Sequence, residues 1–166
     1  IGQGALLVTP LQLAVATARL TKGNKPITPH LLMTSKQEKI QNLSAHPVDN
    51  TKALDTIRVA MQDVITAPNG TAINFGKNSK YPVAGKTGTV QVIKKKNYAH
   101  ISQMMLPKKL RNNHLFIAFA PAKNPTIAVA VVIEHASDDD GIARKFIDAY
   151  FKLYNKHATG SKDASK

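Results

Sequence analysis

The segment 84–90, with the sequence AGKTGTV, concentrates residue types that bind an anion. Its lysine, Lys86, supplies a positive charge, and Thr87 and Thr89 supply hydroxyl donors. Neighbouring valines favour a β-strand here, and glycine inside a strand usually marks the close approach of another backbone or a ligand. We therefore predict a strand on which Gly88 admits a ligand backbone while the lysine and the threonines face an anion.

Gly85-Lys86-Thr87 also matches the end of a phosphate-binding P-loop. That pattern requires a glycine five positions before Gly85, where the sequence has Lys80, and a helix that begins at the lysine. The residues that follow Lys86 instead favour a continuing strand. The sequence thus disfavours a nucleotide site.

Other candidate ligands have simpler interpretations. The six histidines form no i,i+2 or i,i+4 pair and the chain has no cysteine, which disfavours a metal site. Residues 138–140, three consecutive aspartates, are better explained as helix-capping residues than as ligands for a hard cation. We expect neither a metal nor a cofactor.

The chain has 166 residues, 43% of them apolar, which is enough for one compact domain. Its formal net charge is +13, and residues 51–113 contain eleven of the basic side chains but two of the acidic ones. The densest part is the basic loop 94–111, whose simplest interpretation is a solvated loop. Tyr98, Met104, Met105 and Leu106 add the alternative of a contact with a membrane surface or a partner beside the ligand strand.

The high charge supports an alternative function, a non-catalytic basic binding module for nucleic acid or another anionic surface. However, no predicted helix concentrates lysine and arginine on one face, and no aromatic-basic stacking motif recurs. Nucleic acid is therefore not the partner that we expect.

Three helices are predicted from capping signals and apolar periodicity. Thr9, Pro10 and Gln12 form a capping box with proline at the first helical position, so the first helix spans residues 10–21 and stops at Gly23. The second has an apolar face from Leu54 to Ile65, with Asp49 or Asn50 as cap and Pro68-Asn69-Gly70 as its end. The last follows the aspartates, with apolar residues from Ile142 to Leu153.

Strands are predicted over residues 81–93, 115–120 and 126–134. The last two are nearly continuous apolar runs joined by a short turn, which is typical of central, antiparallel neighbours. A further short strand is expected over 27–33, followed by a loop over 35–46. The fold class is α+β, an antiparallel sheet of about three long strands with packed helices.

Four stretches, AGKTGTVQV, IGQGALLVTPLQLA, HLFIAFAP and PTIAVAVVIE, resemble the class B penicillin-binding proteins, and most closely their penicillin-binding protein 2 group. The resemblance covers residues 1 to about 154 in the family's order of elements. It implies a subset of the penicillin-recognising, β-lactamase-like serine transpeptidase fold, with the Lys-Thr-Gly box on a strand that edges the active site. It also implies a D,D-transpeptidase that cross-links peptidoglycan stem peptides through a serine acyl-enzyme and binds β-lactams.

The resemblance assigns roles to four residues. Lys86 and Thr89 would act in catalysis, the lysine by placing positive charge near the proton relay and Thr89 by offering a backbone amide to the oxyanion. The substrate carboxylate would bind to Lys86, Thr87 and Thr89, and Gly88 would admit the substrate backbone. One oxyanion donor is typically worth about 10²- to 10³-fold in rate.

The family's nucleophile lies in Ser-x-x-Lys and its relay in Ser-x-Asn, and no serine of this chain begins either motif. The given sequence begins at Ile1, with neither an initiator Met nor a signal-peptide pattern. We therefore expect residues 1–156 to be the C-terminal portion of a transpeptidase domain and residues 157–166 to be a disordered tail. Such a fragment is expected to be inactive alone and to self-associate through uncovered strand edges. The full-length protein would lie in the periplasm, anchored to the inner membrane by a missing N-terminal segment, and would work with the cell-wall elongation machinery.

Overall fold

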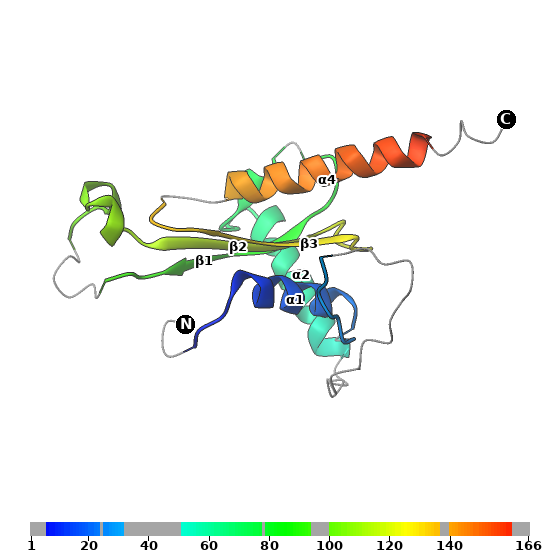
Figure 1. Ribbon diagram of the computed structural model, residues 1–166, viewed down its shortest axis with the longest axis horizontal. Helices are drawn as coiled ribbons and strands as arrows, with labels where there is room; N and C mark the ends of the chain where they lie inside the picture. Colours follow the sequence, from blue (N-terminus) through cyan, green and yellow to red (C-terminus); the bar gives the residue numbers. More distant parts are fainter. Residues whose placement is uncertain are drawn as a thin grey trace.

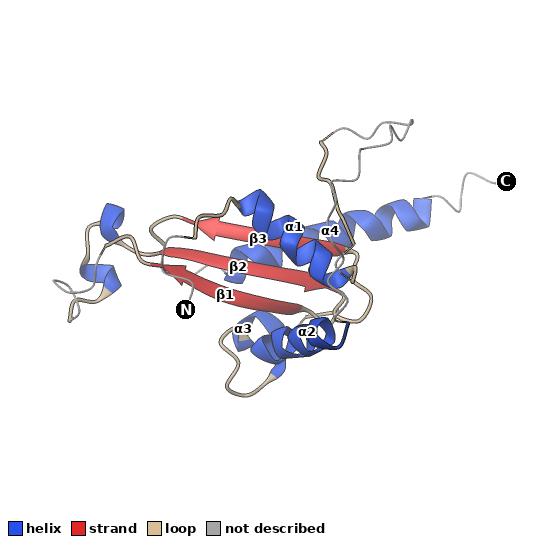
Figure 2. Ribbon diagram, turned by 90° about the horizontal axis from the view of Figure 1, so that it is seen from below, coloured by secondary structure: helices blue, strands red, loops and turns tan. Residues whose placement is uncertain are grey.

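The computed structural model of the chain consists of a sheet between helices (Figure 1). It describes residues 6–23, 25–31, 51–77, 79–93, 100–136 and 140–160, with the side chains of 140 and 155–160 excepted. Helix α1 (Pro10–Thr21) covers one face of the sheet and α4 (Asp140–Gly160) covers the other (Figures 1 and 2). This arrangement confirms the α+β fold that the sequence predicts.

The sheet has the strand order β1-β2-β3 and is antiparallel throughout. Its strands are β1 (Ala84–Val90), β2 (Asn113–Ala120) and β3 (Ile127–Ile133). The register pairs Thr87 with Phe116 and Ala118 with Val129. β2 is central as predicted, whereas β3 lies at an edge of the described sheet, and β1 forms the other edge.

Two further helices lie beside β1. α2 (Thr51–Thr66) contacts β1, and the short α3 (Ile73–Gly76) follows it (Figure 2). The prediction of α2 is confirmed, and Met61 and Ile65 lie on its buried face. α3 was not predicted, because four residues are too few to show apolar periodicity.

The first helix begins with the predicted capping box. The Thr9 hydroxyl accepts a hydrogen bond from the Gln12 amide at 3.2 Å, and the Gln12 side-chain oxygen accepts one from the Thr9 amide at 2.8 Å. Gly23 follows the last turn with a φ of 66°, a conformation that glycine adopts without strain. The first helix thus has the bounds that the sequence predicts.

Two groups of buried side chains form the core, one on each side of the sheet. The larger joins α2, α3 and α4 to the strands through residues that include Ile65, Phe75, Phe116 and Ile147. The smaller contains Met61, Ala84 and Phe119, with Leu20 of α1 packed against it. Because α2 contributes to both groups, it holds the beginning of β1 in place from the side.

Several boundaries differ from the predictions. Residues 27–31 form no strand, since Pro26 and Pro29 lack the amide hydrogen that strand pairing uses. α4 continues to Gly160, past residue 157, where the sequence predicts that a disordered tail begins.

The β1–β2 connection contains two 3₁₀ turns, η2 (Gln103–Met105) and η3 (Lys108–Leu110), where the sequence predicts a plain loop. Predictions for residues 32–50, 94–99, 137–139 and 161–166 lie outside the described residues. In the part that the structure describes, no helix is both long and apolar enough to cross a membrane.

Candidate functional site

The four residues predicted to face a ligand lie together on β1, an edge of the described sheet. Side chains alternate between the two faces of a strand, so Lys86 and Gly88 share the face of Ala84. Thr87 and Thr89 share the opposite face. The lysine and Thr89 are exposed, and Thr87 and Gly88 are half-buried.

The Lys86 side chain bends back onto its own strand. Its ammonium group donates a hydrogen bond to the Thr87 carbonyl oxygen at 2.8 Å. The positive charge is therefore held next to the Thr87 position without a carboxylate partner among the ion pairs of the described residues. An exposed ammonium that bonds to a neutral carbonyl still has hydrogens to donate to an anion.

Thr87 has a second hydroxyl beside it. The hydroxyl oxygen of Thr71, in the turn between α2 and α3, lies 3.1 Å from the hydroxyl oxygen of Thr87. This contact joins positions 16 residues apart in the sequence, and sequence reasoning missed it. In this region the sequence predicted only that Pro68-Asn69-Gly70 ends the second helix.

The turn that carries Thr71 is fixed by its backbone. The amide of Ala72 donates to the Val64 carbonyl oxygen at 3.0 Å, and Gly70 packs so closely that a Cβ atom there would lie 2.4 Å from the same oxygen. Only glycine fits such a contact, because real side chains do not approach a backbone oxygen this closely. The Thr71 hydroxyl is therefore presented from a rigid support.

Gly85, not Gly88, is the glycine of β1 that packs most tightly. A Cβ atom on Gly85 would lie 2.8 Å from the Ile117 carbonyl oxygen and 2.9 Å from Cζ of Phe116. The nearest neighbour of a Cβ on Gly88 would be Cβ of Leu115 at 3.3 Å. The first glycine thus serves the packing of β1 against β2, a role that the sequence did not indicate.

A network of polar and aromatic side chains supports the beginning of β1 from α4. The Tyr81 hydroxyl donates a hydrogen bond to Asp148, and Arg144 contacts both oxygens of that carboxylate at 3.0 Å. Arg144 also donates to the Phe75 carbonyl oxygen at 2.6 Å. The network therefore ties α3 and the residues before β1 to one face of α4.

Aromatic contacts extend this support. The ring of Phe75 stacks on Phe116 with centroids 4.9 Å apart, and the ring of Tyr81 packs on Phe151 at 4.3 Å. Partial burial, together with the Asp148 hydrogen bond, raises the pKa of Tyr81 to about 12. The phenol therefore stays neutral and donates its hydrogen at neutral pH.

The β1–β2 connection is folded upon itself. Arg111 donates to the carbonyl oxygens of Met104 and Leu106, each at 3.1 Å, and Leu106 is buried. Ile101, Met104 and Met105 are exposed. Lys108 and Lys109 are also exposed, so this end of the basic loop presents both charge and apolar surface.

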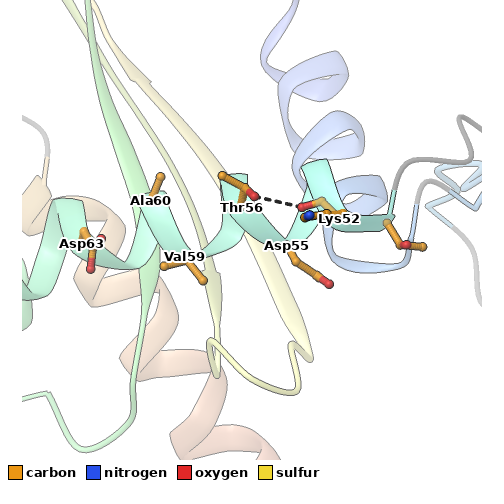
Figure 3. Close-up of a pocket in the computed structure, with 7 residues that line it drawn as sticks. Lys52, Asp55, Thr56, Val59, Ala60 and Asp63 are labelled. Carbon is orange, nitrogen blue, oxygen red and sulfur yellow. Dashed lines mark hydrogen bonds between the residues drawn. The ribbon is translucent and has the colours of Figure 1, made fainter.

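A hollow on the surface of α2 has no residue of β1 in its lining (Figure 3). Its lining belongs to one helix and consists of Thr51, Lys52, Asp55, Thr56, Val59, Ala60 and Asp63. The Thr56 hydroxyl donates to the Lys52 carbonyl oxygen of its own helix at 3.0 Å, and Asp55 pairs with Arg58 at 2.7 Å. Because Thr56 and Asp55 bond to groups of their own helix, we do not take the hollow as the candidate functional site.

No group of three or more histidine or acidic side chains among the described residues could hold a metal ion. On β1, at an edge of the described sheet, an ammonium group and two threonine hydroxyls lie between positions 86 and 89. Groups of these kinds can donate hydrogen bonds to an anion.

Comparison with known protein families identifies one domain. Residues 1–151 match the penicillin binding protein transpeptidase domain. The peptidoglycan D,D-transpeptidase MrdA of Salmonella typhimurium is 34% identical over 162 residues, which cover 91% of this chain and 26% of the relative. The protein of the same name from Acinetobacter baumannii is 36% identical over 165 residues, with 94% and 24% covered.

Solved structures show the same likeness. Penicillin-binding protein 2 from Helicobacter pylori, in a complex with MreC, has a TM-score of 0.73 and 31% identity over 92% of this chain and 26% of that one. Penicillin-binding protein 2 from Pseudomonas aeruginosa, in complex with WCK 5153, has a TM-score of 0.58 and 29% identity over 93% and 32%. The chain thus spans about a quarter of the length of the curated relatives it matches.

Proposed function

Because the chain belongs to the penicillin-binding protein transpeptidase family, we propose that it is the C-terminal part of a peptidoglycan D,D-transpeptidase. Its share of the active site is β1, which binds the stem peptide that the enzyme cross-links. The observation that carries this proposal is the gathering of Lys86 and Thr87 on an edge strand, beside the exposed Thr89.

The substrate carboxylate is the anion that these groups fit. A D-alanyl-D-alanine terminus ends in a carboxylate, which accepts hydrogen bonds from two hydroxyls and attracts an ammonium group. Thr87 and Thr89 project from one face of β1, two residues apart. Lys86, which directly precedes Thr87, carries the positive charge, and its ammonium group bends back to the Thr87 carbonyl oxygen. β-Lactams carry a comparable carboxylate, so they bind to the same residues.

The backbone of β1 provides a second element of recognition. In an antiparallel strand, the amide and carbonyl groups of every second residue point to the same side. The Thr87 carbonyl bonds to the exposed Lys86 side chain, and we infer that it faces the open edge. Thr89, two residues on, then directs its amide to that edge, where it serves an extended substrate peptide and the oxyanion of the reacting carbonyl.

The nucleophile comes from elsewhere in the full-length protein, since neither Ser-x-x-Lys nor Ser-x-Asn occurs in this sequence. The chain alone is therefore inactive, and it self-associates through β1 and β3, the two edges of the described sheet. In the full-length enzyme we place this domain in the periplasm, anchored to the inner membrane. We also infer a role with the elongation machinery, supported by the relative solved in a complex with MreC.

Labelling by a fluorescent penicillin tests the proposal. The 166-residue chain and a longer protein that extends upstream through Ser-x-x-Lys are compared side by side. The longer protein is expected to label and the chain alone is not. Lys86→Ala in the longer protein should lower the second-order labelling rate about ten- to a hundredfold, the effect of removing a charged hydrogen-bond donor.

Lys52→Ala provides the matched control, because Lys52 is an exposed lysine of α2 that lines the hollow apart from β1. Its labelling rate should equal that of the unchanged protein. Failure of the longer protein to label, with its fold intact by circular dichroism, would overturn the proposed function. An equal loss in both lysine variants would remove the role assigned to Lys86.

A further inference from the structure

The contact between Thr71 and Thr87 lies at the proposed carboxylate site yet involves a residue outside the strand. Their hydroxyl oxygens are 3.1 Å apart, Thr71 is exposed, and Thr87 is half-buried. Neither hydroxyl is sealed from solvent. A ligand on the open edge of β1 can therefore reach the pair.

Either hydroxyl can donate the hydrogen in this contact, and the choice decides what Thr87 can offer to a ligand. Each hydroxyl has one hydrogen to donate and two lone pairs to accept with. When Thr71 donates to Thr87, the hydrogen of Thr87 is left for a third group, and a carboxylate accepts it. When Thr87 donates to Thr71, its hydrogen points away from the ligand, so a bound anion favours the first arrangement. Chains of this kind also strengthen each bond in turn.

Contacts of two residues that follow Thr71, one in the turn and one in α3, hold its hydroxyl next to the Thr87 hydroxyl. The Ala72 amide is bonded to the Val64 carbonyl oxygen, and Phe75 of α3 stacks on Phe116. Phe116 is the residue that pairs with Thr87 in the register of β1 and β2. The Phe75–Phe116 stack therefore links α3, which directly follows the turn of Thr71, to the β2 residue that pairs with Thr87.

We propose that Thr71 is a positioning residue, which directs the Thr87 hydroxyl to donate its hydrogen to the carboxylate of the substrate or of a β-lactam. This inference rests on the proposed function, and it adds to that function a second segment, the turn between α2 and α3. Thr71 acts through Thr87 and needs no contact with the substrate.

The test compares Thr71→Val and Thr71→Ser in the full-length protein, because valine keeps the shape of threonine without its hydroxyl and serine keeps the hydroxyl. The second-order acylation rate is measured with a penicillin that has its free carboxylate and with the methyl ester of the same penicillin. Thr71→Val should slow acylation by the acid about two- to tenfold, the effect of one neutral hydrogen bond. It should leave the rate with the ester unchanged, and Thr71→Ser should restore the rate with the acid.

Thr66→Val serves as the control, since the Thr66 hydroxyl bonds to the Gln62 carbonyl oxygen of α2 and not to β1. An equal loss with acid and ester would mean that Thr71 has a structural role alone, and it would overturn the inference. So would a Thr71→Val variant that acylates as fast as the unchanged protein. If the unchanged protein is not acylated at all, the proposed function itself fails.

Discussion

Tyr81 donates its hydroxyl hydrogen bond to Asp148, and this bond joins the residues that lead into β1 to helix α4. The two positions are 67 residues apart in the sequence. Arg144 shares the same carboxylate and reaches the Phe75 carbonyl oxygen. The placement of β1 therefore depends on Asp148, a hydrogen-bond acceptor on α4.

Removing the Tyr81 hydroxyl should weaken this junction. Tyr81→Phe keeps the ring that packs on Phe151 but leaves Asp148 without one donor. The free energy of unfolding should fall by about 1 kcal/mol, as measured by urea denaturation. Tyr150→Phe is the control, because its hydroxyl makes a longer, exposed bond of 3.3 Å to the Thr126 carbonyl oxygen. Equal stability of Tyr81→Phe and the unchanged chain would contradict the prediction.

The same hydroxyl predicts a loss of stability at high pH. The pKa of Tyr81 in the folded chain is raised from 10.0 to about 12, so the unfolded chain loses this proton first. The contribution is fully present below pH 10 and is lost as the pH rises from 10 towards 12. Unfolding free energies across this range should fall more steeply for the unchanged chain than for Tyr81→Phe. Parallel curves would argue against the raised pKa.

Gly85 should tolerate no larger residue. Gly85→Ala places a methyl group 2.8 Å from the Ile117 carbonyl oxygen, within β1 and β2, where both backbones are held by pairing. We expect a loss of about 1–3 kcal/mol in the free energy of unfolding, the usual cost of overpacking. Gly141→Ala is the matched control, since nothing lies within 4 Å of a Cβ atom there. Two variants of equal stability would refute the packing role.

Arg58 should contribute more to the free energy of unfolding than an exposed ion pair with Asp55 would. Its guanidinium donates to the Leu20 carbonyl oxygen twice, from Nε at 2.9 Å and from Nη2 at 2.6 Å, and so ties the end of α1 to α2. Arg58→Ala should lower the free energy of unfolding by about 1.5–3 kcal/mol, because charged donors are lost from an orphan helix carbonyl.

The partner in the ion pair provides the control for Arg58. Asp55→Asn removes the exposed pair at 2.7 Å and keeps the bonds to Leu20, so its cost should stay below about 1 kcal/mol. Thermal or chemical denaturation of both variants checks the difference. If Asp55→Asn costs as much as Arg58→Ala, the ion pair and not the carbonyl contact holds the helices together.

Local signals in the sequence predicted the main helices and strands. They did not predict contacts between side chains that lie far apart in the sequence. The capping box at Thr9 and the apolar runs of β2 and β3 are read within a few residues, and each is confirmed. The hydroxyl pair of Thr71 and Thr87 depends on how two elements pack, which no periodicity encodes. The same holds for the bond from Tyr81 to Asp148.

The candidate site shows the same division. The residue types of the segment 84–90 predicted an anion-binding strand, and β1 does occupy an edge of the described sheet. The roles of Lys86, Thr87, Gly88 and Thr89 in substrate binding stay predictions. Gly85 shows what residue types alone do not give, because its close neighbours belong to β2 and follow from how the two strands pack.

The simple order of the sheet bears on how the domain assembles. β1, β2 and β3 are neighbours in space in the order of the sequence, so the β1–β2 pairing closes residues 91–112 and the β2–β3 pairing closes residues 121–126. Contacts of α1 with β2 and β3 instead close the much longer stretch between Thr21 and Asn113. Because closing a long loop costs more entropy than closing a shorter one, we expect the strands to pair before α1 docks. On this expectation β1, the strand that carries the proposed recognition groups, is in place before α1 covers its face of the sheet.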